Sequence, residues 1–372
     1  MTDFTQELER VAAVATKHAA NVDEDARFPQ ETVDTFLQSG LGGLVSASEF
    51  GGKGGTLRDA ATVIERLARE CGSSAMILAM HYSGVFVIEQ YGDEATRRDV
   101  ANGKHLSTLA FSEAGSRSHF WAPLSTAKAD NGHVTLDAKK SWITSANYAT
   151  AYVWSSQPCA AEGMSTIWLV PREAEGLQSP GPFRGLGLRG NDSTPVSATG
   201  VKIPAGNRLG EDGQGFDVMM SNVLPNFSVL NAACSIGLME AISQNASAHC
   251  AGTGYQHLDS KLADLPTIRA YLARMRGKTD MVRSLWLDTI SALEAGREDA
   301  MLRVLEVKAF AGEESVEVGQ LGMRVCGGAA YRKEVGVERR FRDAQAAIIM
   351  APTTDVLYDF IGKAVTGMEL FG

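Results

Sequence analysis

Cysteine and positive charge are both scarce in this sequence, and each shortage argues against a class of protein. The five cysteines are an odd number, lie far apart and form no C-x-x-C pair, so neither a disulfide framework nor a zinc site is expected. Reduced thiols in a cytoplasmic protein without a metal centre are the expectation. The net charge of −9 disfavours nucleic acid as a partner, because affinity for phosphate backbones comes from neutralising cations.

Long hydrophobic runs are absent as well. No stretch approaches about 18 uninterrupted apolar residues, so no membrane span is expected. The first residues, MTDFTQE, lack the positive and apolar regions of a secretory signal, and no polybasic run that would attract an anionic membrane is present. Proline is also rare, with 11 residues against 38 glycines, so the many glycines are expected at particular places where the backbone turns or approaches a ligand.

The chain of 372 residues is long enough for two or three packing units, and its apolar pattern changes twice. Roughly the first hundred residues repeat every three or four positions and predict helices. Short alternating strands follow, with a hairpin at the Asp-Asn-Gly turn of residues 130–132, and they indicate a small barrel or sandwich. The helical period then returns and predicts four long helices that form a bundle. These helices are expected over 229–248, 262–293, 298–320 and 352–365.

The predicted fold class is therefore α+β, mainly α. It comprises an N-terminal α-helical domain (1–105), a central small β-barrel domain (106–215) and a C-terminal four-helix bundle (216–372). No strand is followed by G-x-G-x-x-G and a helix, and no Walker A sequence occurs. Rossmann and P-loop folds are consequently not favoured.

Four short segments, at 48–55, 109–116, 138–146 and 326–344, together with the three-part layout, resemble the acyl-CoA dehydrogenase family of flavoproteins, and the resemblance extends over nearly the whole chain. Residues 48–55 read SEFGGKGG, 109–116 read LAFSEAGS, and 138–146 read AKKSWITSA, close to the family's G-x-K-x-W-I-T-N-A. The fourth segment is CGGAAY at 326–331 with VERRFRDA at 337–344. Each match alone is weak, but four in the right order at plausible spacing identify the chain as a member of this family.

The resemblance implies FAD as the cofactor. Trp142 would pack against the isoalloxazine ring and the Thr144 hydroxyl would reach its N5 atom. Phe111 would line the ring, Ser112 would bond its pyrimidine end in place of the usual Thr, and Ser116 would lie beside both cofactor and substrate.

Further expected contacts lie near the C-terminus. Gly327 and Gly328 would let a neighbouring subunit's backbone approach the FAD pyrophosphate, and Thr353 would also touch the cofactor. Arg324 stands where family members usually have Gln, and the Arg that the family often carries in the bundle is missing near residues 251–256. Arg324 could therefore restore a cation near the pyrophosphate.

The catalytic glutamate is the main departure from the family. Its usual position, in a stretch like Y-E-G-T, is Ala351 here, next to Met350, and both are expected to contact substrate. An alternative position on the first bundle helix holds Phe227, followed by Ser228 where many members have Arg. His119 becomes the candidate base because its pKa can lie near neutrality, although it could equally cap a turn or face solvent. Asp355 is expected one helical turn past Ala351 and to point elsewhere.

Three functions fit these residues. The first is FAD-dependent α,β-dehydrogenation of an acyl thioester, bound to CoA or a carrier protein, with a non-standard base. The second is a flavin-dependent monooxygenase or N-hydroxylase on the same fold, which needs no glutamate. The third is a non-catalytic flavin-binding or assembly subunit. An electron-transfer flavoprotein or a flavin reductase is the expected redox partner, and the chain is expected to form a homodimer or homotetramer.

Overall fold

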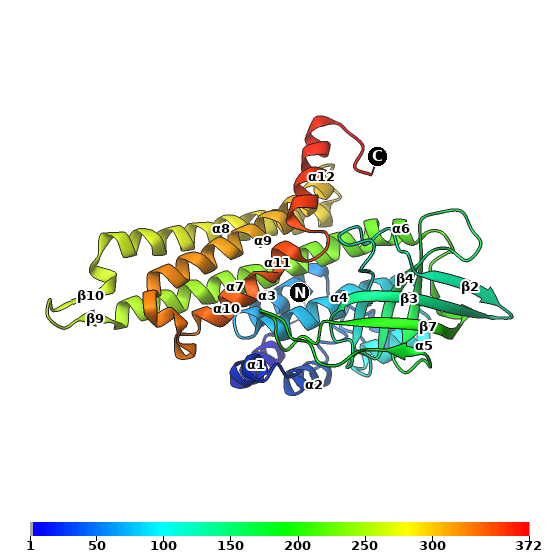
Figure 1. Ribbon diagram of the computed structural model, residues 1–372, viewed down its shortest axis with the longest axis horizontal. Coiled ribbons are helices and arrows are strands. Elements are labelled where there is room, and N and C mark those ends of the chain that lie inside the picture. Colours follow the sequence, from blue (N-terminus) through cyan, green and yellow to red (C-terminus); the bar gives the residue numbers. More distant parts are fainter. Residues whose placement is uncertain (1–2, 372) are drawn as a thin grey trace.

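The computed structural model describes residues 3–371, and its helices and strands lie in three parts of the chain (Figure 1). Residues 1, 2 and 372, which the predicted domain limits include, lie outside the described residues. The first part is helical, as predicted. Its elements are α1 (Thr5–Glu24), α2 (Gln30–Gln38), α3 (Leu57–Ala68), α4 (Gly72–Tyr91) and α5 (Glu94–Ala101). Thr56 caps α3 by accepting from the Asp59 amide, and the Asp59 side chain accepts from the Thr56 amide in return.

The central part consists of two four-stranded sheets that enclose one core. One sheet has the order β1-β4-β5-β8 and the other β2-β3-β7-β6. Their bounds are β1 (Ser107–Ala110), β4 (Ala151–Ser156), β5 (Thr166–Pro171), β8 (Arg208–Leu209), β2 (Thr126–Asp130), β3 (His133–Ile143), β7 (Thr194–Pro204) and β6 (Leu177–Gln178). The predicted hairpin joins β2 to β3, and its Asn131 and Gly132 have φ of 45° and 83°, as a tight hairpin turn requires. Trp154 of one sheet and Leu136 of the other are both fully buried in the shared core.

The C-terminal part is the predicted helical bundle. Its long helices are α7 (Leu224–Gly252), α8 (Pro266–Ala295), α9 (Ala300–Cys326) and α12 (Thr354–Thr366). Shorter elements are α6 (Gly215–Val218), α10 (Val337–Ala344), α11 (Ala346–Ile349) and the small hairpin of β9 (Gly254–Tyr255) and β10 (Ser260–Lys261). Among residues 3–371, no helix is long and apolar enough to cross a membrane.

Two details differ from the sequence-based expectations. Helix α12 begins at Thr354, so Ala351 precedes it and Asp355, which is exposed in its first turn, is not one helical turn past Ala351. Helix α10 was not expected, because its sequence VERRFRDA is mostly charged and has too few apolar residues to show a helical period.

The charged helix α10 joins the three parts of the chain. Asp343 is buried, and its carboxylate accepts from the Leu188 amide at 2.6 Å, beside the start of α4 at Gly72. Burial raises the pKa of Asp343 to about 6. Arg342 pairs with Asp23 of α1 at 2.8 Å, and Arg340 donates to the Arg69 carbonyl at 2.7 Å. The RDA residues of the fourth matching segment therefore link α10 to the N-terminal helices and to the β domain.

Candidate functional site

A buried ion pair locks two of the matching segments together. Lys140 of β3 donates to Glu113, in the loop after β1, at 2.7 Å, and also to the Ser155 carbonyl at 2.7 Å. Glu113 in turn accepts from the backbone amide of Leu124 at 2.7 Å and from the Ser125 hydroxyl. Burial lowers the pKa of Lys140 to about 8 against the opposing pull of Glu113. The loop that carries Phe111, Ser112 and Ser116 is thereby held against the end of β3.

Beyond Lys140, strand β3 exposes one aromatic side chain, that of Trp142. Its register with β7 shifts between Lys140 and Ile143, and Trp142 within this bulge has φ of 58°. The Trp142 side chain is 71% exposed, whereas Thr144, two residues on, is buried with its hydroxyl 3.1 Å from that of Ser193. A bulge of this kind aims a side chain out of the sheet at some cost in backbone strain, which is common at binding sites.

The same loop touches the C-terminal segment that precedes α12. Thr353 donates its amide to the Ser118 hydroxyl oxygen at 3.0 Å. Ser116, which Ser118 follows closely, has a buried hydroxyl that makes no hydrogen bond to any residue in 3–371. Met350 and Ala351 are half-buried just before this contact. The structure therefore brings the loop of Ser116 against Thr353, and the Ser112 carbonyl accepts from the Ser141 amide next to Trp142 at 2.9 Å.

Both positions where a glutamate is usual lie beside one buried lysine. Lys308 of α9 donates to the carbonyls of Met350 and Pro352 at 3.0 and 2.7 Å, and so flanks Ala351. Its Nζ atom lies 5.8 Å from the centroid of the Phe227 ring on α7. Ala351 and Phe227 are thus both neighbours of Lys308, and neither side chain can accept a proton.

His119 lies on the outer side of the loop. Its amide donates to the Ser116 carbonyl at 3.0 Å, and its ring is tilted against Trp121 at 5.0 Å between centroids. The imidazole is exposed and makes no hydrogen bond to another side chain within the described chain. No neighbouring group orients it as a base, so its catalytic role stays a prediction.

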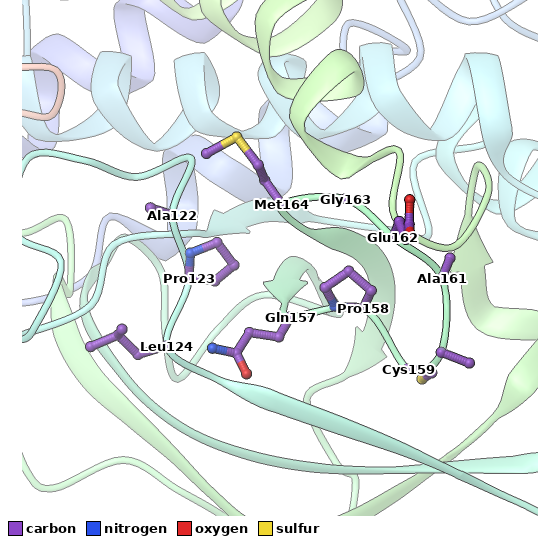
Figure 2. A pocket seen from close by; sticks show the side chains of 11 residues that line it. Ala122, Pro123, Leu124, Gln157, Pro158, Cys159, Ala161, Glu162, Gly163 and Met164 are labelled. Carbon is purple, nitrogen blue, oxygen red and sulfur yellow. The ribbon is translucent and has the colours of Figure 1, made fainter. Parts of the chain in front are cut away.

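A cavity of about 560 Å³ opens beside this loop. It is lined by Ala122–Leu124 on one side and Gln157–Met164 on the other (Figure 2). The carboxylate of Asp212 shapes the second wall by accepting from the amides of Ala160 and Ala161, both at 2.9 Å. Of the lining side chains only Glu162 is charged, so the cavity offers no cation to a phosphate group.

Comparison with known proteins identifies the family. Models of the acyl-CoA dehydrogenase N-terminal, middle and C-terminal domains match residues 3–103, 108–201 and 213–366. The chain belongs to the acyl-CoA dehydrogenase family. The recognition made from the four sequence segments is confirmed, as is the predicted fold class.

Individual relatives are distant but match over nearly their whole length. A probable acyl-CoA dehydrogenase of Bacillus subtilis is 26% identical, with 91% of this chain and 90% of that protein covered. The mitochondrial isobutyryl-CoA dehydrogenase of Bos taurus is 24% identical, with 94% and 84% covered. The solved structure of butyryl-CoA dehydrogenase from Megasphaera elsdenii superposes with a TM-score of 0.90 at 23% identity, covering 98% of this chain and 99% of that one.

A further structural neighbour is the prolyl acyl carrier protein oxidase AnaB. It superposes with a TM-score of 0.88 at 16% identity and covers 98% of this chain and 99% of its own. Identities this low show a shared fold. These structural similarities, together with the family models, make this chain an acyl-CoA dehydrogenase-like oxidoreductase, as predicted. The members of this family depend on FAD.

The residues around Trp142 fit an isoalloxazine ring. The large Trp142 indole is exposed rather than packed in the core, and two residues further along the chain the Thr144 hydroxyl lies 3.1 Å from that of Ser193. The orphaned Ser116 hydroxyl provides a further donor or acceptor that the polypeptide leaves unused. Flavin sites need such an apolar wall together with a few polar groups at the ring edge.

The other predicted cofactor residues lie far from Trp142 within one chain. Arg324, Gly327 and Gly328 are at the C-terminal end of α9, away from the two four-stranded sheets (Figure 1). Sixteen residues of helix separate Arg324 from Lys308, which corresponds to about 24 Å. Gly327 and Gly328 are exposed, and a Cβ atom added to either would meet nothing within 4 Å. Their position is compatible with approach to a ligand held by a second subunit.

Sequence reasoning missed the Glu113–Lys140 pair and Lys308. Glu113 and Lys140 stand inside quoted segments, so the matching charges were visible, but their pairing was not. Lys308 had one signal, because it interrupts the apolar run of VLEVKAFA at a position that faces the bundle interior.

Proposed function

We propose that the chain binds FAD and catalyses α,β-dehydrogenation of an acyl thioester. The exposed Trp142 indole, which follows the buried Glu113–Lys140 pair on β3 by two residues, is the observation that carries this proposal. FAD, when bound, supplies the hydride acceptor. Trp142 would bind one face of the ring, while Phe111, Ser112, Ser116, Thr144 and Thr353 would contact its edge and orient it.

The substrate would lie against Met350, Ala351 and Ser116. A thioester makes its own α-proton more acidic, and hydrogen bonds to its carbonyl stabilise the negative charge that develops. CoA and carrier-protein thioesters both remain candidates, since relatives include butyryl-CoA dehydrogenase and a prolyl acyl carrier protein oxidase. The lack of a cation in the neighbouring cavity favours a substrate part without phosphate at that place. His119 remains the proposed proton acceptor.

A second candidate function follows from the two missing carboxylates. With Ala351 and Phe227 at the glutamate positions, the chain suits a flavin-dependent monooxygenase or N-hydroxylase, which has no need of an α-proton acceptor. A non-catalytic flavin-binding subunit is the third, but the exposed Trp142 argues that the cofactor surface is in use.

One anaerobic experiment separates these functions. Protein loaded with FAD is mixed with a panel of acyl thioesters, and the flavin absorbance near its visible maximum is followed. Bleaching without oxygen supports dehydrogenation. Absence of bleaching, with rapid oxygen consumption once a flavin reductase supplies electrons, supports the monooxygenase. Neither response would point to the non-catalytic subunit.

Arg324→Ala should cause loss of FAD. The Arg324 guanidinium is exposed, lies 4.9 Å above the Tyr271 ring and forms no ion pair with any described residue, so it is free to pair with a pyrophosphate. Gel filtration followed by an absorbance ratio measures the occupancy. Arg274→Ala, which removes an exposed cation paired to Glu317 on the same helix bundle, is the control. Full occupancy in the Arg324 variant would contradict the assignment.

The chain should be a homodimer or homotetramer in solution. Gly327 and Gly328 lie at the end of α9 that is remote from the two four-stranded sheets, so in this proposal they would contact the FAD of a second copy (Figure 1). Exposed apolar side chains on the outer helices, such as Met281, Phe310 and Val365, would be covered by the partner. Light scattering gives the mass, and a monomer that retains FAD would be the contrary result. We also propose that the redox partner is an electron-transfer flavoprotein or a flavin reductase.

A further inference from the structure

Lys308 is a fully buried cation without a carboxylate partner. Its side chain extends from α9 and is 0% exposed. Its hydrogen bonds go to two main-chain carbonyls, those of Met350 and Pro352, and its Nζ atom lies 5.8 Å from the centroid of the Phe227 ring on α7. No acidic side chain forms an ion pair with it in the described chain. This contrasts with Lys140, the other buried lysine, which has Glu113 at 2.7 Å.

Such a group is costly to the fold. Desolvation of an ammonium group is offset only in part by hydrogen bonds to neutral carbonyls. Burial accordingly lowers the pKa of Lys308 to about 7. A methionine of similar size would fill the same space without this cost, so the stability of the bundle does not account for a lysine here.

The two carbonyls that Lys308 binds indicate that its role is to hold the segment around Ala351. They belong to the residues on either side of Ala351, in a stretch that lies between α11 and α12 and makes helical hydrogen bonds only at its ends, through the Met350 amide and the Thr353 carbonyl. The opposite end of this stretch is held by Ser118 through the Thr353 amide at 3.0 Å. The Asn231 amide of α7 also approaches the Met350 sulfur at 3.4 Å. The segment Met350–Thr353 is thus held between the bundle and the loop of the β domain.

We propose that Lys308 is a positioning residue that fixes the segment Met350–Thr353, and with it residue 351, against Phe227 and the Ser118 loop. This rests on the proposed function, which places Met350 and Ala351 against substrate and Thr353 against FAD. Lys308 acts through the segment and does not itself contact the substrate. Without its two donors, both carbonyls lose their buried partners and the segment moves toward water.

The test compares Lys308→Met with Lys308→Arg, which keeps the donors, and with Lys278→Met. Lys278 pairs with Glu314 and Glu317 on the outer side of the bundle and does not touch the segment, so it controls for loss of a lysine. Three quantities are measured on FAD-loaded protein. They are the melting temperature, hydrogen exchange of peptides that contain residues 350–354, and the apparent KM in anaerobic flavin reduction.

In Lys308→Met, exchange at 350–354 should rise at least about tenfold, in line with the loss of a hydrogen bond to a charged group. The melting temperature should stay the same or rise, because a buried charge has been removed. The apparent KM should rise about tenfold, and Lys308→Arg should restore part of both effects. Lys278→Met should change neither exchange nor KM.

A lower melting temperature with unchanged exchange at 350–354 would overturn the proposal, since Lys308 would then serve only the stability of the bundle. Should the methionine variant not fold, Lys308→Gln, which is too short to reach both carbonyls, takes its place with the same expected exchange. The exchange measurement needs no turnover. If none of the thioesters reduces the flavin of the unmodified protein, the proposed reaction is wrong. The positioning role of Lys308 is then still decided by the exchange measurement.

Discussion

Replacing Lys140 with methionine should lower the free energy of unfolding by about 3–5 kcal/mol, the usual cost of leaving one partner of a buried ion pair alone. Glu113 would remain only 3% exposed, with the hydrogen bonds from Leu124 and Ser125 but without its cation. The loop that bears Ser112 and Ser116 would loosen, so bound FAD should decrease as well. Denaturant unfolding followed by far-UV circular dichroism measures the stability, and flavin absorbance measures the occupancy.

Two further variants make the Lys140 result specific. Lys139→Met changes the adjacent, exposed lysine of β3 and should alter stability by less than about 0.5 kcal/mol. The double variant Lys140→Met with Glu113→Gln removes both charges and should recover a large part of the loss. If the single and double variants were equally unstable, the pair would contribute through packing alone and the electrostatic account would be wrong.

Ala351→Glu should raise dehydrogenase turnover by about 10²-fold or more, the usual contribution of a positioned general base. Residue 351 is half-buried, and its flanking carbonyls are held by Lys308, so a carboxylate introduced there would stand on a fixed backbone. The rate of anaerobic flavin reduction by the best thioester of the panel measures the gain.

Ala351→Gln is the matched control for the glutamate variant. It has nearly the same shape but cannot accept a proton, so it should show no gain over the unmodified protein. A glutamate variant that is no faster than the glutamine variant would count against dehydrogenation and favour the monooxygenase. Lys308→Met combined with Ala351→Glu should lose much of the gain, because the glutamate would stand on a mobile segment.

Periodicity and turn chemistry explain why much of the fold could be predicted. The long helices α8 and α9 bury apolar residues at helical spacing, α7 is apolar and buried on all sides, and the Asp-Asn-Gly turn favours the hairpin that joins β2 to β3. Helix α10 escaped prediction because charged side chains dominate it and because its contacts are salt bridges and main-chain hydrogen bonds to other parts of the chain. The start of α12 was misplaced by two residues for a related reason, since the stretch before it is held by tertiary contacts.

The candidate site divides in the same way. Trp142 and Thr144 were found from a local motif, and the structure shows that a bulge exposes one and buries the other. Whether they bind FAD stays a prediction, as does every other site residue. Lys308 could not be found from its surroundings in the sequence, because its partners are carbonyls 42 and 44 residues away.

The sequence by itself determined the family, the order of helical, β and helical parts, and the absence of a carboxylate at positions 351 and 227. These follow from local patterns and from residue identity, which do not depend on how the chain is folded. Only the tertiary structure decided that Glu113 pairs with Lys140, that Lys308 lies between Ala351 and Phe227, and that Gly327 and Gly328 lie remote from Trp142. Those are contacts between residues far apart in the chain, and they depend on the packing of helices and sheets rather than on any short stretch of sequence.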